Sequence, residues 1–516
     1  ADLLSRFERS AGDEPRLDGH YVAACGDVGR RRLSLFRDPG GAEQLYFVRV
    51  GGLLLFSSCV KPLLAHAAVP RAVCADTILE YALYGVVAFG DATPFEGIRE
   101  VLPGHRLDVS DEGFVQRWHW GALLTSAEGD PGDLAGQLWE RLRGGVRSAL
   151  GGDSEAAVSL SGGIDSSAVA AALVEELGPE RVHAFTYEFV DSPIQSEVPS
   201  ARAVCRHLGI RRHTVKRISF EENLEALPEA IWMQERACSW GVAGVELLMA
   251  RAVASHGHRK YFSGFGIGGH LHYWQELADV LSVRPAAEMF YAYWRMAAPS
   301  PYKTRWRLIS RLHPALAPLI LTSPLHGLLA LSVLRHNDLI DGLAGFCPRS
   351  AGPLIEELAS RPRVREAVAQ LRGQPLAAQL QFHDFVHLSS YVDRGRRDKI
   401  SRLAGVMKIS PFLFPSCLPL TVMPPRTAFS FWDSRRRLRP GKLFLQEAMK
   451  EKLPDETVRR GKLWGVVPIP RAWVLPTLQR LAPQVASSME QLRPLFGEDW
   501  DLLRRQPMHD LTLLAL

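Results

Sequence analysis

The chain has few cysteines, and none of them are spaced to cross-link a small fold or to hold a metal. Seven cysteines are spread over 516 residues, an odd number with no C-x-x-C pair. This spacing excludes a disulfide framework and a paired-cysteine zinc site. The opening residues, ADLLSRFERSAG, show no signal-peptide pattern. We therefore expect a protein of a reducing, cytoplasmic compartment.

Charge of one sign and uninterrupted apolar runs are also scarce. Lys and Arg number 61 against 56 Asp and Glu, a net charge of +5 that predicts no strong basic surface for nucleic acid. Residues 315–334 contain no Asp, Glu, Lys or Arg, but Pro318 and Pro324 interrupt them. Buried helices are therefore favoured over a membrane span. With 47% apolar residues, the chain can form a large core.

The length predicts two or three domains, and the composition changes near residue 122. Residues 1–122 alternate short apolar runs with turn residues, which predicts a sheet-rich domain. Residues 123–136 are small, polar and glycine-bearing, as in a linker. The strands expected before this linker are 20–25, 31–36, 44–50 and 52–58.

The second predicted domain, residues 137–516, alternates strands with helices. This alternation predicts an α/β fold with a parallel sheet and crossover helices. The expected strands are 155–161, 181–189 and 211–218, and the expected helices are 134–150, 165–177 and 196–210. Residues from about 280 to 380 are helical in pattern and punctuated by proline, which predicts a helical insertion.

Two glycines end the first strand of this domain, in the stretch VSLSGGIDSS. Ser161, Gly162 and Gly163 lie where a parallel sheet presents helix N-termini to a ligand. Glycine permits positive φ and a close approach of an anion, which the helix amides and dipole favour. Phosphate is therefore the expected ligand. The alternative is a helix N-cap whose glycines serve only packing.

The residues after the glycines have the chemistry to complete such a site. The hydroxyls of Ser161, Ser166 and Ser167 are expected to donate to the anion, and Asp165 to hold Mg²⁺ against the same phosphates. The segment is neither a Walker sequence, since no GK[ST] follows, nor G-x-G-x-x-G.

The turn resembles that of the pyrophosphate-loop ATP pyrophosphatases, and further stretches narrow the resemblance to the asparagine synthetase family. One of them, RRDKISRLAGVMKISPFL, resembles the family's R-x-D-K-x-S, a glycine, and then P-F-L. The stretches that carry the resemblance are 17–24, 37–47, 83–107, 396–413 and 441–465. The resemblance covers most of the chain apart from about 280–380.

The resemblance implies a fold and a reaction. The N-terminal domain would be an αββα sandwich-like, degenerate glutaminase-like domain, followed by the pyrophosphate-loop domain with helical additions. The reaction would be activation of a carboxylate by ATP as an acyl-adenylate, with loss of pyrophosphate. Attack by an amine would then give an amide and AMP.

The resemblance also implies roles for particular residues. Asp398 and Lys399 match the R-x-D-K motif near the acyl site. Lys462 matches a lysine that neutralises charge on the α-phosphate and on the tetrahedral intermediate, although RRGKLWG alone would indicate a surface lysine. The residues implied to bind ATP and Mg²⁺, the latter through Asp165, are Ser161, Gly162, Gly163, Asp165, Ser166, Gly264 and Gly266.

The sequence departs from the family at the segment SGFGIGGHLHYW, residues 263–274. Gly268 and Gly269 stand where a second acidic Mg²⁺ ligand is expected, and Phe265 replaces a glutamate used at the amide-forming step. His270 or His272 would compensate by hydrogen bonding, although a histidine beside an aromatic cluster is more often structural. Either metal binding rests on Asp165 alone or the site is impaired.

No cysteine nucleophile opens the chain, and Cys25 and Cys59 lie in apolar strands, so we expect a branch of the family without glutaminase. Two branches fit: the β-lactam synthetases and the lasso-peptide cyclases, which join a peptide's N-terminal amine to an Asp or Glu side chain. Lys408 stands where the glutamate of the β-lactam branch would fall, which disfavours that branch.

The expected function is therefore macrolactam formation on a peptide. The segment at 280–380 contains FYAYWRM and TRWRLISRL, a surface for a peptide or simply an amphipathic helix on its own core. The expected partners are a peptide or small-molecule carboxylate, a leader-peptide-binding protein and a protease. The alternatives are β-lactam-like or asparagine-like amidation, or a degenerate homologue that only binds nucleotide. Modification of tRNA is disfavoured by the absence of paired cysteines and of a basic stripe.

Overall fold

The computed structural model describes residues 17–29, 31–78, 90–111, 113–118, 131–190, 196–235, 243–267, 395–421 and 443–459. All of them belong to one compact unit, formed by residues 1–267, 386–428 and 442–516. The other unit, residues 268–385 and 429–441, lies outside the described residues, and with it the predicted helical insertion. Among the described helices, none is long and apolar enough to cross a membrane; residues 315–334 are not among them.

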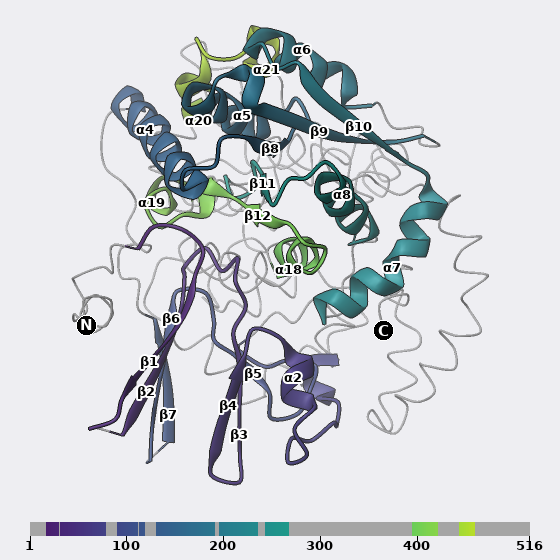
Figure 1. Cartoon of the computed structure of the whole chain (residues 1–516). Coiled ribbons are helices and arrows are strands. Elements are labelled where there is room, and N and C mark those ends of the chain that lie inside the picture. The colour runs from purple at the N-terminus through teal and green to yellow at the C-terminus, as the bar shows by residue number, and fades with distance from the viewer. Residues whose placement is uncertain are drawn as a thin grey trace, which may run out of the picture. The chain divides into compact units, whose positions relative to one another are not determined.

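The N-terminal part forms two antiparallel sheets, with strand orders β1-β2-β6-β7 and β4-β3-β5 (Figure 1). The elements are β1 (Val22–Asp27), β2 (Arg32–Arg37), β3 (Tyr46–Val50), β4 (Leu53–Ser57), α2 (Val60–Leu64), β5 (Arg99–Glu100), β6 (His105–Ser110) and β7 (Gly113–Trp118). The four strands predicted here are confirmed, with ends that shift by one or two residues.

Strand β3 is buried on both faces, because its side chains alternate between two apolar layers. Phe47 packs in one cluster with Leu35 of the other sheet. Tyr46 and Val48 pack on the opposite side with Val60 of α2. The three-stranded sheet is therefore a middle layer between α2 and the four-stranded sheet.

The second part is built on a five-stranded sheet of order β10-β9-β8-β11-β12, in which all neighbours are parallel. The strands are β8 (Ala156–Ser159), β9 (Val182–Phe189), β10 (Arg212–Ile218), β11 (Lys260–Phe262) and β12 (Met407–Ile409). Strand β12 pairs with β11 although nearly 150 residues separate them. The predicted α/β class with a parallel sheet is confirmed.

Helices connect and flank these strands (Figure 1). They are α4 (Pro131–Leu150), α5 (Ile164–Leu177), α6 (Val198–Leu208), α7 (Phe220–Gln234), α8 (Ala243–Ser255), α18 (Gly395–Leu403), α19 (Leu418–Thr421), α20 (Leu443–Met449) and α21 (Asp455–Arg459). Short 3₁₀ turns occur at η2 (Pro179–Arg181) and η6 (Pro411–Leu413).

Helix α4 corrects the end of the predicted linker. It begins at Pro131, so residues 131–136 are helical rather than part of a linker over 123–136. Proline suits the first helical position, where its missing N–H would have no partner in any case. Leu138, Leu142 and Val146 are fully buried at a spacing of four, which is the apolar stripe of a packed helix.

Two apolar clusters position the helices that matter for the site. Helix α8 covers one face of the sheet, where Val245 and Met249 pack with Ala157 and Phe185. Helix α18 packs against α7 and α8 through the fully buried Ile400. These contacts fix α18, which carries the R-x-D-K motif, next to the sheet.

Candidate active site

The predicted glycine turn joins β8 to α5 with the expected backbone. Gly162 has φ +74, a left-handed conformation that favours glycine. A Cβ at Gly162 would lie 2.4 Å from the Ser200 carbonyl carbon and 2.6 Å from the Ala201 nitrogen. Position 162 therefore needs glycine both for its φ and because helix α6 packs directly on the turn.

The hydroxyls of Ser161 and Ser166 hold the turn in shape. The Ser166 hydroxyl donates to the Gly163 carbonyl (3.2 Å) and accepts from the Ser161 amide (3.2 Å). The Ser161 hydroxyl lies 3.1 Å from the Ser166 hydroxyl and accepts from the Gly163 amide (3.2 Å). Ser167 is fully buried, so its hydroxyl does not reach the open side of the turn, contrary to expectation.

A second glycine loop closes over this turn. It follows β11 and begins at Ser263, whose amide donates to the Ile409 carbonyl of β12 (2.8 Å). A Cβ at Gly264 would lie 2.4 Å from the Ser166 nitrogen, and one at Gly266, with φ +112, would lie 2.6 Å from Leu413 Cγ. The structure thus brings together three predicted stretches, 161–166, 263–266 and 410–413, at the carboxyl ends of β8, β11 and β12.

The carboxyl edge of a parallel sheet is where open α/β folds bind their ligands, and the glycine turn lies at that edge. Helix α5 begins after Gly163 with no side chain capping its N-terminus, and Asp165 lies in its first turn. A helix N-terminus without a side-chain cap, together with the helix dipole, suits an anion. Within the described ranges, no group of three or more His, Cys, Asp and Glu is arranged to hold a metal. A Mg²⁺ ion at Asp165 would be held by one or two carboxylates, with phosphate oxygens and waters as further ligands.

A polar chain below the turn went unnoticed in the sequence. Thr186 of β9 donates its hydroxyl proton to the Leu160 carbonyl (2.6 Å), and His213 Nε2 lies 2.8 Å from the Thr186 hydroxyl oxygen. Because Thr186 already donates its hydroxyl proton to Leu160, the ring N–H of His213 donates to the Thr186 hydroxyl oxygen. Burial, with help from Arg202, lowers the pKa of His213, so the ring is neutral near pH 7. This chain supports the residue that precedes Ser161.

Helix α18 carries Asp398 and Lys399, the residues implied to lie near the acyl site. The helix runs into β12 through a short turn, so its first residues lie at the carboxyl edge of the sheet. Asp398 is buried. Lys399 is also buried, and its ammonium forms an ion pair with Glu235 and lies 5.4 Å from the centre of the Tyr46 ring.

Lys408, on β12, is buried and donates to Glu246 of α8 (2.6 Å). Lys408, which the resemblance sets at the position of the glutamate of the β-lactam branch, is therefore a buried lysine paired with a carboxylate. Glu246 and Glu235 were both missed from the sequence, since each meets its lysine across more than 160 residues. Lys462, Gly268 and Gly269, like His270 and His272, lie outside the described residues.

N-terminal side chains fix the segment after β12. His20 Nε2 accepts from the Ser410 amide (3.2 Å), so the ring proton is on Nδ1. Asp18 accepts from the Ser416 amide (3.0 Å) and hydroxyl (2.8 Å). The LDGH and ISPFL stretches, both part of the resemblance, are thus in contact.

Comparisons with known proteins find similar sequences for both parts of the chain. The asparagine synthase family model matches residues 137–500, and the glutamine amidotransferase domain model matches residues 6–120. Amidase chyE of Penicillium rubens is 28% identical over 284 residues, which cover 52% of this chain and 41% of that protein. Asparagine synthetase [glutamine-hydrolyzing] 3 of Bacillus subtilis is 26% identical over 179 residues, 34% of this chain and 29% of its own length.

A probable asparagine synthetase of Acanthamoeba polyphaga mimivirus is 36% identical over 236 residues, 44% of this chain and 39% of its own. Among solved structures, the glutamine-dependent NAD⁺ synthetase of Acinetobacter baumannii in complex with ADP matches at 16% identity and a TM-score of 0.18, over 46% of this chain and 57% of that one. The chain spans only 29% to 41% of these three curated relatives. Since the asparagine synthase model covers well over half of the 516 residues, the chain belongs to the asparagine synthase family.

Proposed function

We propose that this chain is an ATP-dependent ligase that forms an amide in two steps. A carboxylate oxygen attacks the α-phosphorus of ATP, which releases pyrophosphate and leaves an acyl-adenylate. An amine then attacks the acyl carbon, loses a proton, and expels AMP. The observation that carries the proposal is the contact of Gly264 with the Ser166 backbone, which places two nucleotide-binding stretches of the resemblance against each other.

In this proposal the turn at Ser161, Gly162, Gly163 and Ser166 holds the pyrophosphate portion at the N-terminus of α5. The loop containing Gly264 and Gly266 closes over it, and Asp165 holds Mg²⁺, whose contribution is to neutralise phosphate charge. A closed site of fixed amides suits charge that develops as pyrophosphate leaves.

The acyl transfer is assigned to the other side of the same edge. Asp398 faces the acyl substrate from α18, and Lys462 supplies the positive charge that stabilises the tetrahedral intermediate. Lys399, with its ammonium engaged by Glu235, contributes by positioning rather than by contact with substrate.

For the substrate we propose a peptide, and for the product a macrolactam of the lasso-peptide type. One feature supports this choice over a β-lactam, and a second supports it over asparagine. Lys408 is a buried, paired cation where the β-lactam branch needs a base. Phe265 puts an aromatic side chain where asparagine synthetases have a glutamate. That a relative is named an amidase supports amide chemistry beyond asparagine in this family. A leader-peptide-binding protein and a protease are the partners that such a substrate implies.

The test is incubation of the chain with ATP, Mg²⁺ and candidate precursor peptides, with AMP, pyrophosphate and product mass as readouts. We expect AMP and pyrophosphate in equal amounts and a peptide lighter by one water. Asp165→Ala should abolish all three, whereas Asp153→Ala, at an exposed carboxylate paired with Lys260, should retain them.

Other outcomes separate the alternatives. Conversion of free aspartate to asparagine would overturn the macrolactam assignment but keep the ligase. ATP binding by calorimetry, with no AMP from any peptide or amino acid, would favour the degenerate homologue that Gly268 and Gly269 suggest.

A further inference from the structure

Glu235 occupies an unusual position for a charged residue. It ends helix α7 with φ +57, a left-handed backbone that only glycine, asparagine and aspartate adopt readily. Its side chain is 2% exposed. Such a conformation persists only where the surroundings hold it.

The carboxylate joins the two parts of the described structure. One oxygen accepts from the Val60 amide (2.7 Å) and the other from the Lys61 amide (3.0 Å), both at the start of helix α2. The oxygen that accepts from Val60 also forms the ion pair with Lys399 of α18. A single buried carboxylate thus connects the N-terminal sheets with the helix that carries Asp398.

Helix α18 makes a second contact of the same kind, one turn further on. Arg402 forms an ion pair with Glu43. Residues 399 and 402 are three apart and so share one face of the helix. That face also meets Tyr46, whose ring lies beneath the Lys399 ammonium. The N-terminal part therefore holds α18 along one side.

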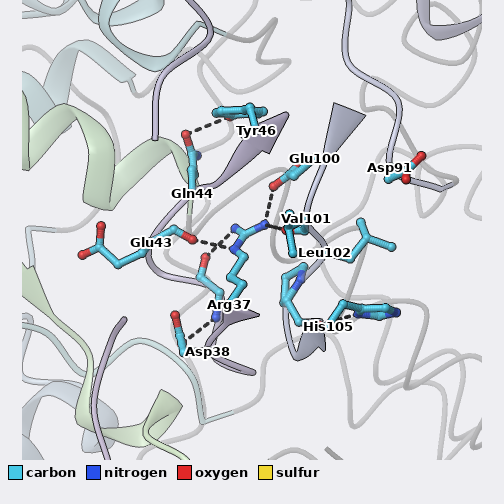
Figure 2. A network of polar contacts seen from close by, with 12 residues as sticks. Arg37, Asp38, Glu43, Gln44, Tyr46, Asp91, Glu100, Val101, Leu102 and His105 are labelled. Carbon is cyan, nitrogen blue, oxygen red and sulfur yellow. Dashed lines mark hydrogen bonds and ion pairs between the residues drawn. The ribbon is translucent and has the colours of Figure 1, made fainter. Parts of the chain in front are cut away.

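The N-terminal side of these contacts is itself held firmly. Figure 2 shows the Arg37 guanidinium at the centre of the segment that contains Glu43 and Tyr46. Its side chain is fully buried and donates to the Glu43 carbonyl (2.5 Å), the Gly41 carbonyl (2.9 Å) and the Glu100 carboxylate (2.5 Å). Tyr46 in turn donates its hydroxyl to Gln44 (2.9 Å). The surface offered to α18 is therefore preorganised.

We propose that Glu235 is a positioning residue: acting through Lys399, it fixes helix α18 and with it Asp398, so that the N-terminal sheets form part of the acyl site. The assignment of an acyl site at Asp398 rests on the proposed function; the coupling itself does not. Loss of the Glu235 charge leaves Lys399 buried without its counter-ion and weakens the cap on α2, so the two helices should loosen together.

The first test is hydrogen exchange, which needs no substrate. In Glu235→Gln we expect exchange to rise by about tenfold or more in peptides covering both 59–64 and 395–403, with β9 unchanged as an internal reference. The matched control is Glu229→Gln, on the same helix α7, whose partner Arg251 is exposed; it should change neither peptide. Loosening of 59–64 without 395–403 would overturn the coupling.

The second test separates positioning from general damage. Glu235→Gln should leave ATP affinity within about twofold by calorimetry, because the turn at 161–166 is not in the contact, while substrate-dependent pyrophosphate release falls by about tenfold or more. Adding Lys399→Met removes the unpaired charge and should restore part of the protection of 395–403 but not of 59–64.

The outcomes distinguish the two proposals. If wild-type chain releases no pyrophosphate with any substrate, the proposed function fails, and the exchange data still decide the role of Glu235. If pyrophosphate release is normal in Glu235→Gln although both peptides loosen, the helix coupling stands but Glu235 is not a positioning residue for the reaction.

Discussion

Gly264 and Ser166 are in backbone contact: a Cβ added at position 264 would lie 2.4 Å from the Ser166 nitrogen and 2.5 Å from the Asp165 carbonyl carbon. The loop that follows β11 therefore rests directly on the first turn of α5. Neither glycine loop can be altered without displacing the other, because the obstructing atoms are backbone and cannot rotate away.

This contact predicts that Gly264→Ala pushes the two loops apart. Overpacking of this kind costs about 1–3 kcal/mol in the free energy of unfolding, and we expect ATP affinity to fall by about tenfold or more as the turn at 161–166 moves. Calorimetry with ATP and urea unfolding measure the two effects. Gly136→Ala is the control: a Cβ there has no neighbour within 4 Å in the described part of the chain, and alanine should slightly stabilise α4. Unchanged ATP affinity in Gly264→Ala would mean that nucleotide does not bind between these loops.

A second prediction separates backbone strain from steric contact at Gly162. Gly162→Ala suffers both, because φ is +74 and a Cβ would meet Ser200 and Ala201. Gly257→Ala suffers strain alone, since φ is +85 and no atom of the described residues lies within 4 Å of a Cβ at that position. We expect Gly162→Ala to lose at least about 1 kcal/mol more of the unfolding free energy than Gly257→Ala, measured in urea. Equal losses would show that α6 moves away from the turn at little cost.

The local features of this fold are those that the sequence predicts well. Strand β8 is a short run of small apolar residues and α5 a longer one, and the two glycines between them mark the turn. The predicted linker ends too late because GDPGDLAG has a loop-like composition, whereas Pro131 begins a helix.

Contacts between distant segments could not be predicted. Glu235 and Lys399 are 164 positions apart, and neither residue type indicates the other. The same holds for Gly264 and Ser166, whose proximity depends on β11 lying beside β8 in the sheet. Sequence patterns identify elements, but only the strand order decides which loops meet.

Substitution of Lys462 tests the role proposed for this lysine in the acyl transfer; the residue itself lies outside the described residues. Lys462→Ala should lower turnover on the order of a hundredfold or more while ATP still binds, as expected for lost stabilisation of a transition state. The control is Lys450→Ala, because the Lys450 side chain is 67% exposed and pairs with Glu447 on the surface. Steady-state release of pyrophosphate and calorimetry with ATP give the two readouts. Near-normal turnover in Lys462→Ala would remove that lysine from the mechanism.

The last prediction concerns acid stability and rests on His105, a buried histidine of β6 that appears in Figure 2. Its ring donates from Nδ1 to the Pro103 carbonyl (2.9 Å). Burial is the main cause that lowers the pKa of His105 from 6.5 to about 4; Arg37 lowers it further, and the bond to Pro103 opposes the shift. The folded protein therefore keeps this ring neutral where the unfolded chain already binds a proton.

The direction in which pH changes the free energy of unfolding depends on whether the folded or the unfolded state binds the proton. Above pH 6.5 both states are neutral at His105, and its full contribution to stability is present. As the pH falls toward 4, the unfolded state gains the proton first, so the free energy of unfolding decreases, by about 3 kcal/mol at most from this group.

His105→Asn keeps a donor for Pro103 but cannot titrate. It should lose less stability than wild type between pH 7 and pH 4 in urea unfolding, whereas His66→Asn, at an exposed ring, should follow wild type. Burial lowers the pKa of His183 to about 4 as well, so His105→Asn should still lose some stability in acid. Parallel curves for wild type and His105→Asn would show that the ring is already protonated in the folded state, or that this part of the sheet opens before the rest of the protein unfolds.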